Sequence, residues 1–224
     1  MSCGRLPILL ILWVCGCFGV QPSFAQEGAS AMETCVPKLS DEVLFNPGMG
    51  LYLQYPPLDA RPDEWFMTIA NIAYYRLDWS EVNPEKGVYR FEEYFGPLFD
   101  FWVRQHGMRV AFRVMCQCMH SRTRYVTPKW VFDQGVPGVI HHNLYGEEQV
   151  NPAFWDDRYL ELQSEFVARL GQYLDGREGL EFVDIGSIGE WGEMHLARWT
   201  RKQLEATGYS EARYIQAYRR IIDA

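Results

Sequence analysis

Short apolar runs alternate with helical patterns along residues 41–224, and this alternation restricts the fold more than any other feature of the sequence. Each apolar run has the length of a strand, whereas each helical pattern repeats its apolar residues every three or four positions. The expected strands are 51–53, 71–77, 109–115 and 180–186, and the expected helices are 92–106, 159–174 and 210–222. Successive strand, helix and strand form a βαβ unit, so the sequence predicts an α/β fold with a parallel sheet.

Two α/β architectures fit this order, a doubly wound sheet and a (β/α)8 TIM barrel. No G-x-G-x-x-G turn follows any of the four expected strands, and a dinucleotide-binding sheet therefore loses its main support. The polar residues of interest instead follow strand ends in long loops, where barrel enzymes place their sites. A complete barrel takes about 250 residues. We therefore expect the first half of a TIM barrel, with four βα units.

Between residues 115 and 159, four turn-forming residues interrupt the apolar pattern: Pro128, Gly135, Pro137 and Gly138. Such residues are typical of connections that run over the surface. The sequence predicts a long polar loop here.

The N-terminus has the pattern of an export signal. Arg5 precedes the apolar run 6–20, and Ser23-Phe24-Ala25 offers small residues for cleavage. We expect a signal peptide at 1–25, a linker at 26–40 and the barrel domain at 41–224. Lipid attachment at Cys17 is the less favoured alternative. No later segment is apolar over the roughly 20 residues that a membrane helix needs, so the protein is expected to be periplasmic or extracellular.

Composition excludes some partners. The chain has 21 basic and 29 acidic residues, a net charge of -8, and no basic stripe that would follow a phosphate backbone. We therefore expect no binding to nucleic acid. With 8 Trp, 13 Tyr and 13 Phe, some aromatic residues are expected to line a ligand cleft.

Three cysteines follow the leader: Cys35, Cys116 and Cys118. In an oxidising compartment, Cys35 can pair with either of the other two and leave one thiol over. The Cys116-x-Cys118 pair lacks the second pair of a structural zinc site, and we expect no metal there.

Two segments of the chain resemble motifs of a known family. Residues 76–91 read RLDWSEVNPEKGVYRF. This segment is similar to the W-x-x-x-x-P-x-x-G-x-Y-x-F stretch after the second barrel strand of clan A glycoside hydrolases, especially the β-galactosidase-like family 42. Residues 188–192 read IGEWG and resemble the Asn-Glu-aromatic-Gly segment that carries the general acid/base. Gly189 stands where the family has the asparagine that contacts the sugar 2-hydroxyl. The resemblance implies a retaining glycosidase that acts on an oligo- or polysaccharide without a cofactor.

The resemblance assigns the general acid/base to Glu190. A retaining glycosidase needs one carboxylic acid to protonate the leaving oxygen and a second carboxylate, about 5 Å away, as nucleophile. A glutamate at the end of a buried strand, between glycines and beside Trp191, is placed for the first role. Glu193 is the rival candidate, and the nucleophile is expected from a later strand outside residues 1–224.

Other polar and aromatic residues complete the candidate site. Arg76 can orient a catalytic carboxylate or pair with Asp78 or Glu81 instead. The candidate substrate contacts are Trp79, Arg113, His120, Trp130, Trp191 and His195, of which the tryptophans are possible stacking surfaces. The order Glu190-x-x-Glu193-x-His195 does not match H-E-x-x-H, so no catalytic metal is expected.

A barrel that binds glycans without hydrolysing them remains the alternative function. Such a protein would keep the tryptophans and lose the pair of carboxylates, and the absence of the asparagine at Gly189 makes this alternative a real one.

Overall fold

A computed structural model describes residues 50–224 of the chain. The expected signal peptide at 1–25, the linker at 26–40 and Cys35 lie outside the described residues. The elements are β1 (Leu51–Gln54), a 3₁₀ turn η1 (Trp65–Thr68), β2 (Ala70–Asp78), α1 (Trp79–Val82), α2 (Phe91–Leu98), a π-helical segment η2 (Phe99–Gln105), β3 (Arg109–Met115), α3 (Lys129–Asp133), β4 (Gly138–His142), β5 (Glu148–Pro152), α4 (Asp157–Leu174), β6 (Leu180–Asp184), a 3₁₀ turn η3 (Glu190–Gly192), α5 (Arg201–Ala206) and α6 (Glu211–Ile222).

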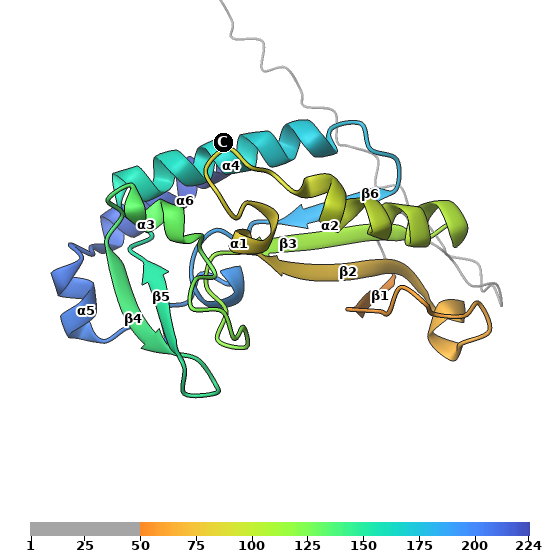
Figure 1. Ribbon diagram of the computed structural model, residues 1–224, viewed down its shortest axis with the longest axis horizontal. Helices are drawn as coiled ribbons and strands as arrows, with labels where there is room; N and C mark the ends of the chain where they lie inside the picture. Colours follow the sequence, from red (N-terminus) through yellow and green to blue (C-terminus); the bar gives the residue numbers. More distant parts are fainter. Residues whose placement is uncertain (1–49) are drawn as a thin grey trace, which may run out of the picture. The chain divides into compact units, whose positions relative to one another are not determined.

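Four strands form one parallel sheet in the order β1-β2-β3-β6 (Figure 1). These are the four strands expected from the sequence, within about two residues at each end, so the parallel α/β class is confirmed. Within residues 50–224, β1 and β6 are the two edges and the sheet is open. A four-stranded parallel sheet is compatible with part of a (β/α)8 barrel and does not by itself establish one.

The prediction of a long loop between residues 115 and 159 is wrong in part. This segment contains α3 and the antiparallel hairpin β4–β5. The inward-facing residues of the hairpin include His141, Gln149 and Asn151, which are polar yet buried. Because strand prediction relies on apolar residues at alternate positions, a hairpin with polar residues on its inner side gives no such signal.

The expected helix 92–106 is present but changes its geometry midway. α2 contains Pro97, which has no N–H to donate within the helix, and the chain continues as the π-helical segment η2. Gly107 ends the segment with a left-handed φ of 66°, as its place in the sequence predicts.

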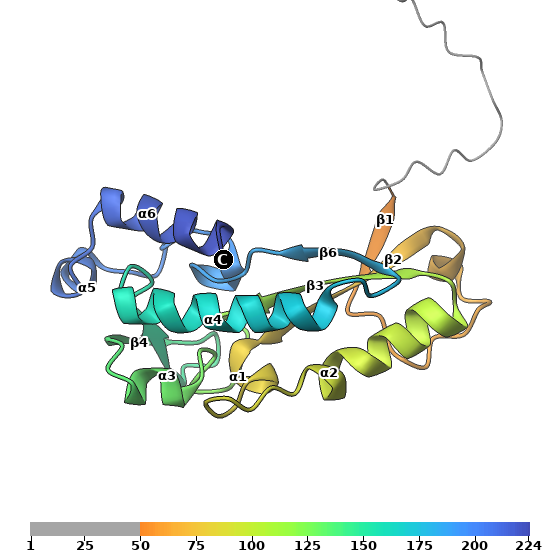
Figure 2. The same ribbon diagram turned by 90° about the horizontal axis from the view of Figure 1, so that it is seen from above.

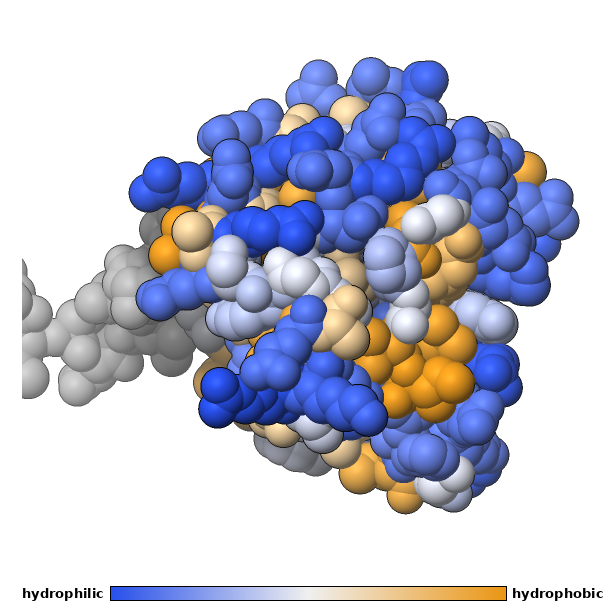
Figure 3. Space-filling model, turned by 90° about the vertical axis from the view of Figure 1, so that its left-hand side faces the viewer, coloured by the Kyte–Doolittle hydropathy of each residue, from blue (hydrophilic) through white to orange (hydrophobic). Residues whose placement is uncertain are grey.

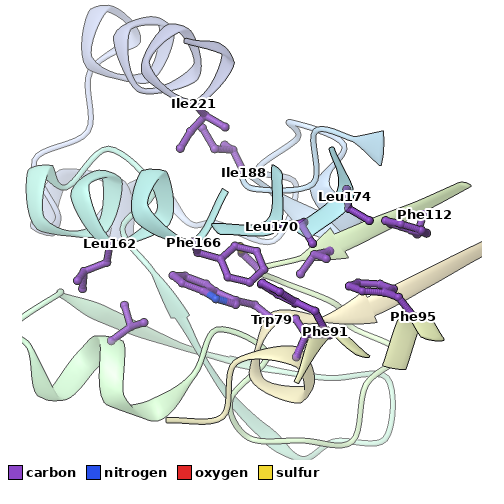
Figure 4. Packing of buried hydrophobic residues seen from close by; sticks show 14 of the residues in the cluster. Trp79, Phe91, Phe95, Phe112, Leu162, Phe166, Leu170, Leu174, Ile188 and Ile221 are labelled. Atoms are coloured by element: carbon purple, nitrogen blue, oxygen red, sulfur yellow. The ribbon is translucent and has the colours of Figure 1, made fainter. Parts of the chain in front are cut away.

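Helices α2 and α4 pack on one face of the sheet and on each other (Figures 1, 2 and 4). Phe112 of β3 stacks on Phe95 of α2 with ring centroids 4.5 Å apart. Phe166 of α4 lies 5.2 Å from the ring of Trp79 and 5.9 Å from that of Phe91. This aromatic cluster is the centre of the hydrophobic core.

The opposite face of the sheet is more open and more polar. Ile72, Tyr74 and Ala111 form a small buried cluster there, whereas Tyr52 and Phe182 remain 50% and 38% exposed. Alternate residues of a strand point to opposite faces, so Arg76 shares this face with Tyr74. The open face therefore brings charged side chains to the carboxyl ends of the strands.

The described residues include no helix that is both long and apolar enough to cross a membrane. The surface on the side of α5 and the β4–β5 hairpin is mostly hydrophilic, with separate hydrophobic areas of which one is larger than the others (Figure 3). Within residues 50–224, neither Cys116 nor Cys118 is part of a disulfide. Their pairing with Cys35 stays a prediction.

The core packing predicts the cost of removing one ring. Phe166→Ala should lower the free energy of unfolding by roughly 3–5 kcal/mol, because it leaves a cavity between Trp79 and Phe91. Phe182→Ala, where the ring is 38% exposed and contacts Tyr74, should cost less, about 1–2 kcal/mol, because water already covers part of the ring. Urea unfolding of both variants measures the difference, and equal losses would contradict the assignment of the core.

Candidate functional site

A cavity of about 610 Å³ lies at the carboxyl ends of β1, β2 and β3. Its lining residues come from these strands, from the segment after β3 and from the loop after β6. They are Gln54, Tyr55, Arg76, Met115, Cys118, His120, Trp191 and Glu193. Ligands of open parallel sheets and of barrels bind at this end of the strands, so the cavity is the candidate site.

Three charged residues lie side by side across the strands beneath the cavity. Arg76 of β2 is in register with Arg113 of β3, and Arg113 is in register with Asp184 of β6. Arg113 donates to Asp184 Oδ2 through Nη2 at 2.7 Å and Nε at 3.1 Å. Tyr74 donates its hydroxyl to the same oxygen at 2.5 Å. Burial and this bond raise the pKa of Tyr74 to about 12, so the hydroxyl remains a donor near neutral pH.

Glu193 is the carboxylate that lines the cavity, and its side chain is 41% exposed. Its Oε1 accepts hydrogen bonds from Arg76 Nη1 at 3.3 Å and from Arg113 Nη1 at 3.4 Å. The ion pair of Arg76 is therefore with Glu193, and not with Asp78 or Glu81. Two guanidinium groups hold one carboxylate oxygen in place. The other oxygen accepts no hydrogen bond from residues 50–224.

Glu190 is placed differently, although it is only three residues away. It is 1% exposed and is not among the residues that line the cavity. Its Oε1 accepts from the backbone N–H of Met119 at 2.5 Å, and its Oε2 accepts from Gln117 Nε2 at 2.9 Å and Arg198 Nη1 at 3.0 Å. Donors of the chain itself therefore occupy both oxygens of Glu190.

Glycines determine the path of the loop after β6, which carries both Glu190 and Glu193. Gly189 has a φ of 82°, and a Cβ there would lie 2.9 Å from the backbone N and O of His195. A Cβ on Gly192 would lie 2.4 Å from the Cα of Gly186. An asparagine, which the family 42 resemblance expects at position 189, does not fit this turn without movement of the backbone.

Backbone strain is concentrated around the cavity. Within residues 50–224, three non-glycine residues have positive φ: Tyr55 at 54°, Trp191 at 53° and Met194 at 62°. Tyr55 and Trp191 line the cavity, and Met194 follows Glu193 directly. Such conformations cost about 1–3 kcal/mol each and are found most often at functional sites.

The ring of Trp191 contacts two histidines. Its Nε1 donates to Nδ1 of His120 at 3.0 Å, and the two rings are stacked with centroids 5.4 Å apart. His195 packs edge-on against Trp191 at 5.6 Å. These contacts fix the ring orientation of Trp191 and leave less of its surface free to stack on a sugar.

Trp79 and Trp130 do not line the cavity. Trp79 is fully buried in the core, and its Nε1 donates to Asn83 Oδ1 at 3.2 Å. Asn83 Nδ2 donates to the carbonyls of Glu85 and Val88, and Trp130 Nε1 donates to the carbonyl of Asn83. The conspicuous residues of the W-x-x-x-x-P-x-x-G segment therefore stabilise the turn after β2 and do not contact the cavity.

Cys118 lines the cavity with a thiol that burial keeps protonated. Burial raises its pKa to about 11 and that of Cys116 to about 12. Because the thiolate is the reactive form, neither side chain is suited to act as a nucleophile at neutral pH. No three His, Cys, Asp or Glu side chains of the described chain are grouped so that they could hold a metal ion.

Asp78 is an acidic residue near the site that the sequence analysis did not select. It ends β2, is buried, and accepts a hydrogen bond from Ser121 Oγ at 2.5 Å. Burial raises its pKa from 3.8 to about 6, although the bond from Ser121 acts in the opposite direction. Its position as the last residue of an apolar strand is the sequence feature that could have identified Asp78 as a candidate, because barrel enzymes place functional residues at strand ends.

The raised pKa of Asp78 predicts a pH-dependent stability. Between pH 3.8 and 6 the folded protein binds more protons than the unfolded chain, so this residue lowers stability as the pH rises, by about 3 kcal/mol in all. Asp78→Asn keeps an acceptor for Ser121 and removes the titration. Its stability relative to the wild type should therefore increase from pH 4 to pH 7 in urea unfolding.

Ser121→Ala provides the matching control. Without the hydroxyl donor, the pKa of Asp78 should rise further, and the loss of stability should extend to higher pH. An Asp78→Asn curve parallel to that of the wild type at every pH would contradict the prediction.

Comparisons with known proteins show a likeness to solved structures and none to a family model or a curated protein. No protein-family model matches the chain, and no curated protein matches it. Among solved structures, a GH42 beta-galactosidase from G. stearothermophilus, determined as a catalytic mutant, is similar to it with 24% sequence identity and a TM-score of 0.43. The match covers 64% of this chain and 22% of that chain. The chain therefore spans less than a quarter of the length of that structure.

Proposed function

We propose that the chain carries part of the active site of a retaining glycoside hydrolase, similar to family 42 β-galactosidases, with the cavity at the strand ends as its sugar site. The observation that supports this proposal most is Glu193, an exposed carboxylate held by Arg76 and Arg113 beside Trp191. Sugar sites of hydrolases combine fixed carboxylates with aromatic rings at this end of a parallel sheet.

Glu193 is the proposed general acid/base, because its carboxylate lines the cavity. In the first step the acid protonates the departing glycosidic oxygen, and in the second it accepts a proton from the attacking water. The two arginines hold Oε1, which leaves Oε2 for the substrate. Glu190, which the family resemblance favours, is the competing assignment, and a change of loop conformation would be needed to bring it to the cavity.

The substrate is proposed to be an oligo- or polysaccharide outside the cytoplasm. The support for export is the apolar run at 6–20 with its following small residues. Substrate contacts are proposed for His120 and Trp191 at the cavity and for His195 beside it. Arg113, which does not line the cavity, is proposed to contribute by orienting the carboxylate of Glu193.

Glutamine variants of the two glutamates, made in the full-length protein, test the proposal. Glu193→Gln should lose about 10²–10⁴ in rate on a methyl glycoside, because the alkoxide then leaves unprotonated. The loss should be smaller on a nitrophenyl glycoside, whose leaving group needs no acid. Azide should partly restore turnover of the nitrophenyl substrate, because it replaces the base-assisted water.

Glu190→Gln is the matched control, three residues away with the same change of charge. It should affect both substrates equally and show no rescue by azide. If Glu190→Gln shows the leaving-group dependence and Glu193→Gln does not, the general acid/base is Glu190. If neither variant loses activity, the hydrolase assignment of this loop fails.

Binding of glycans without hydrolysis is the second candidate function. Among the cavity-lining residues of the described chain, Glu193 is the one carboxylate, whereas retaining hydrolysis needs two. Saccharide binding by the full-length protein, with no turnover of any aryl glycoside, would support this alternative.

A further inference from the structure

Arg198 connects the loop of the candidate site to the β4–β5 hairpin. Its Nη1 donates to Glu190 Oε2 at 3.0 Å, and its Nη2 donates to the carbonyl oxygen of His142, the last residue of β4, at 2.6 Å. The side chain of Arg198 is 17% exposed. The planar guanidinium thus joins Glu190 to His142, which lies 56 residues before Arg198 in the sequence.

Glu190 extends this connection to the end of β3. Gln117 and Met119, which follow β3, donate to the same carboxylate. A buried carboxylate needs charged or hydrogen-bonding partners, and Arg198 is the cation that faces it. Without Arg198, the charge of Glu190 would remain buried with two neutral donors.

Among residues 50–224, Arg198 is the basic side chain that forms an ion pair with Glu190. His141 lies next to it in β4 and is buried. Burial, and then the charge of Arg198, lower the pKa of His141 to about 4, so its ring is neutral near pH 7. Glu190 and a neutral His141 are therefore the titratable groups beside Arg198. The contact with His142 is through its backbone carbonyl, and the side chain of His142 is exposed.

Two residues that closely follow Glu190 in the sequence, Trp191 and Glu193, line the cavity. Trp191 has a strained φ of 53° and donates its backbone N–H to Gln117 O at 2.9 Å. The N–H of Glu193 donates to Glu190 O at 2.9 Å. A strained conformation persists only where its surroundings determine it, and the Glu190 carboxylate is the buried contact at this point of the loop.

We propose that Arg198 is a positioning residue of the candidate site, which acts through Glu190 to hold Trp191 and Glu193 at the cavity. Arg198 does not line the cavity itself. The inference rests on the proposed function only in taking this cavity as the substrate site. Whether Arg198 holds the loop after β6 in place can be measured without a substrate.

Amide hydrogen exchange on the full-length protein without ligand tests the inference. In Arg198→Gln, the N–H groups of Met119, Trp191 and Met194 should exchange at least about tenfold faster, because their acceptors lie on Glu190, Gln117 and Ile188 of this assembly. Arg201→Gln is the matched control. Arg201 pairs with Glu205 at the surface, with a side chain 92% exposed, and its removal should leave these amides unchanged.

Two further variants separate positioning from a general loss of structure. Arg198→Lys keeps the charge but has one nitrogen in place of the two that donate to Glu190 and His142, so its exchange should be intermediate. The double variant Glu190→Gln with Arg198→Gln removes the unpaired buried charge and should exchange more slowly than Arg198→Gln alone.

Exchange in Arg198→Gln within twofold of the wild type would overturn the inference. So would an equal acceleration of the amides of β2 and β3, because that result means that the whole sheet, and not the loop, depends on Arg198. Faster loop exchange in a protein that hydrolyses no glycoside would instead support the inference and count against the proposed function. In an active protein, Arg198→Gln should lower kcat on methyl and nitrophenyl glycosides alike.

Discussion

The side chain of Arg113 joins the sheet to the loop that carries the candidate site. On one side it binds Asp184 of the neighbouring strand through two nitrogens, and on the other its Nη1 donates to the carbonyl of Trp191 at 2.9 Å. The same Nη1 also contacts Glu193. A guanidinium with several fixed donors can make these contacts together, whereas an ammonium group cannot. Arg113 is 14% exposed, so water screens its contacts weakly.

Two glutamates in one turn have different surroundings because of this arrangement. The contacts of Arg113 and Arg76 orient Glu193 at the cavity, and those of Arg198, Gln117 and Met119 hold Glu190 in the interior. The carboxylate of Glu193 lines the cavity, and that of Glu190 is buried. Which of the two a ligand in the cavity can contact therefore depends on the neighbours of each carboxylate, and not on its distance from the end of β6.

The segment that most resembles glycoside hydrolases in sequence lies in the core. Trp79 packs against Phe166, and Asn83 closes the turn that precedes Phe91. Residues that recur for packing reasons carry information about the fold and little about the substrate. For this reason the kind of ligand has to be argued from the cavity, which Tyr55, His120 and Trp191 line.

Local pattern alone determined the four parallel strands, the helices α2, α4 and α6, and the end of η2 at Gly107. These features depend on the alternation of apolar residues and on the backbone freedom of glycine, both of which are readable over a few positions. The grouping of Arg76, Arg113 and Glu193 was partly accessible, because parallel strands bring their carboxyl ends together.

Tertiary structure decided the rest. The β4–β5 hairpin escaped prediction because its buried residues are polar. Gln149 Nε2 donates to carbonyls of the segment after β3, and His141 contacts Asn151 on the opposite strand. The roles of Asp78 and Arg198 depend on Ser121 and Glu190, which are not their neighbours in sequence. Sequence spacing could not decide which of Glu190 and Glu193 faces the cavity, because the left-handed turns at Gly189 and Trp191 reverse the direction of the side chains within three residues.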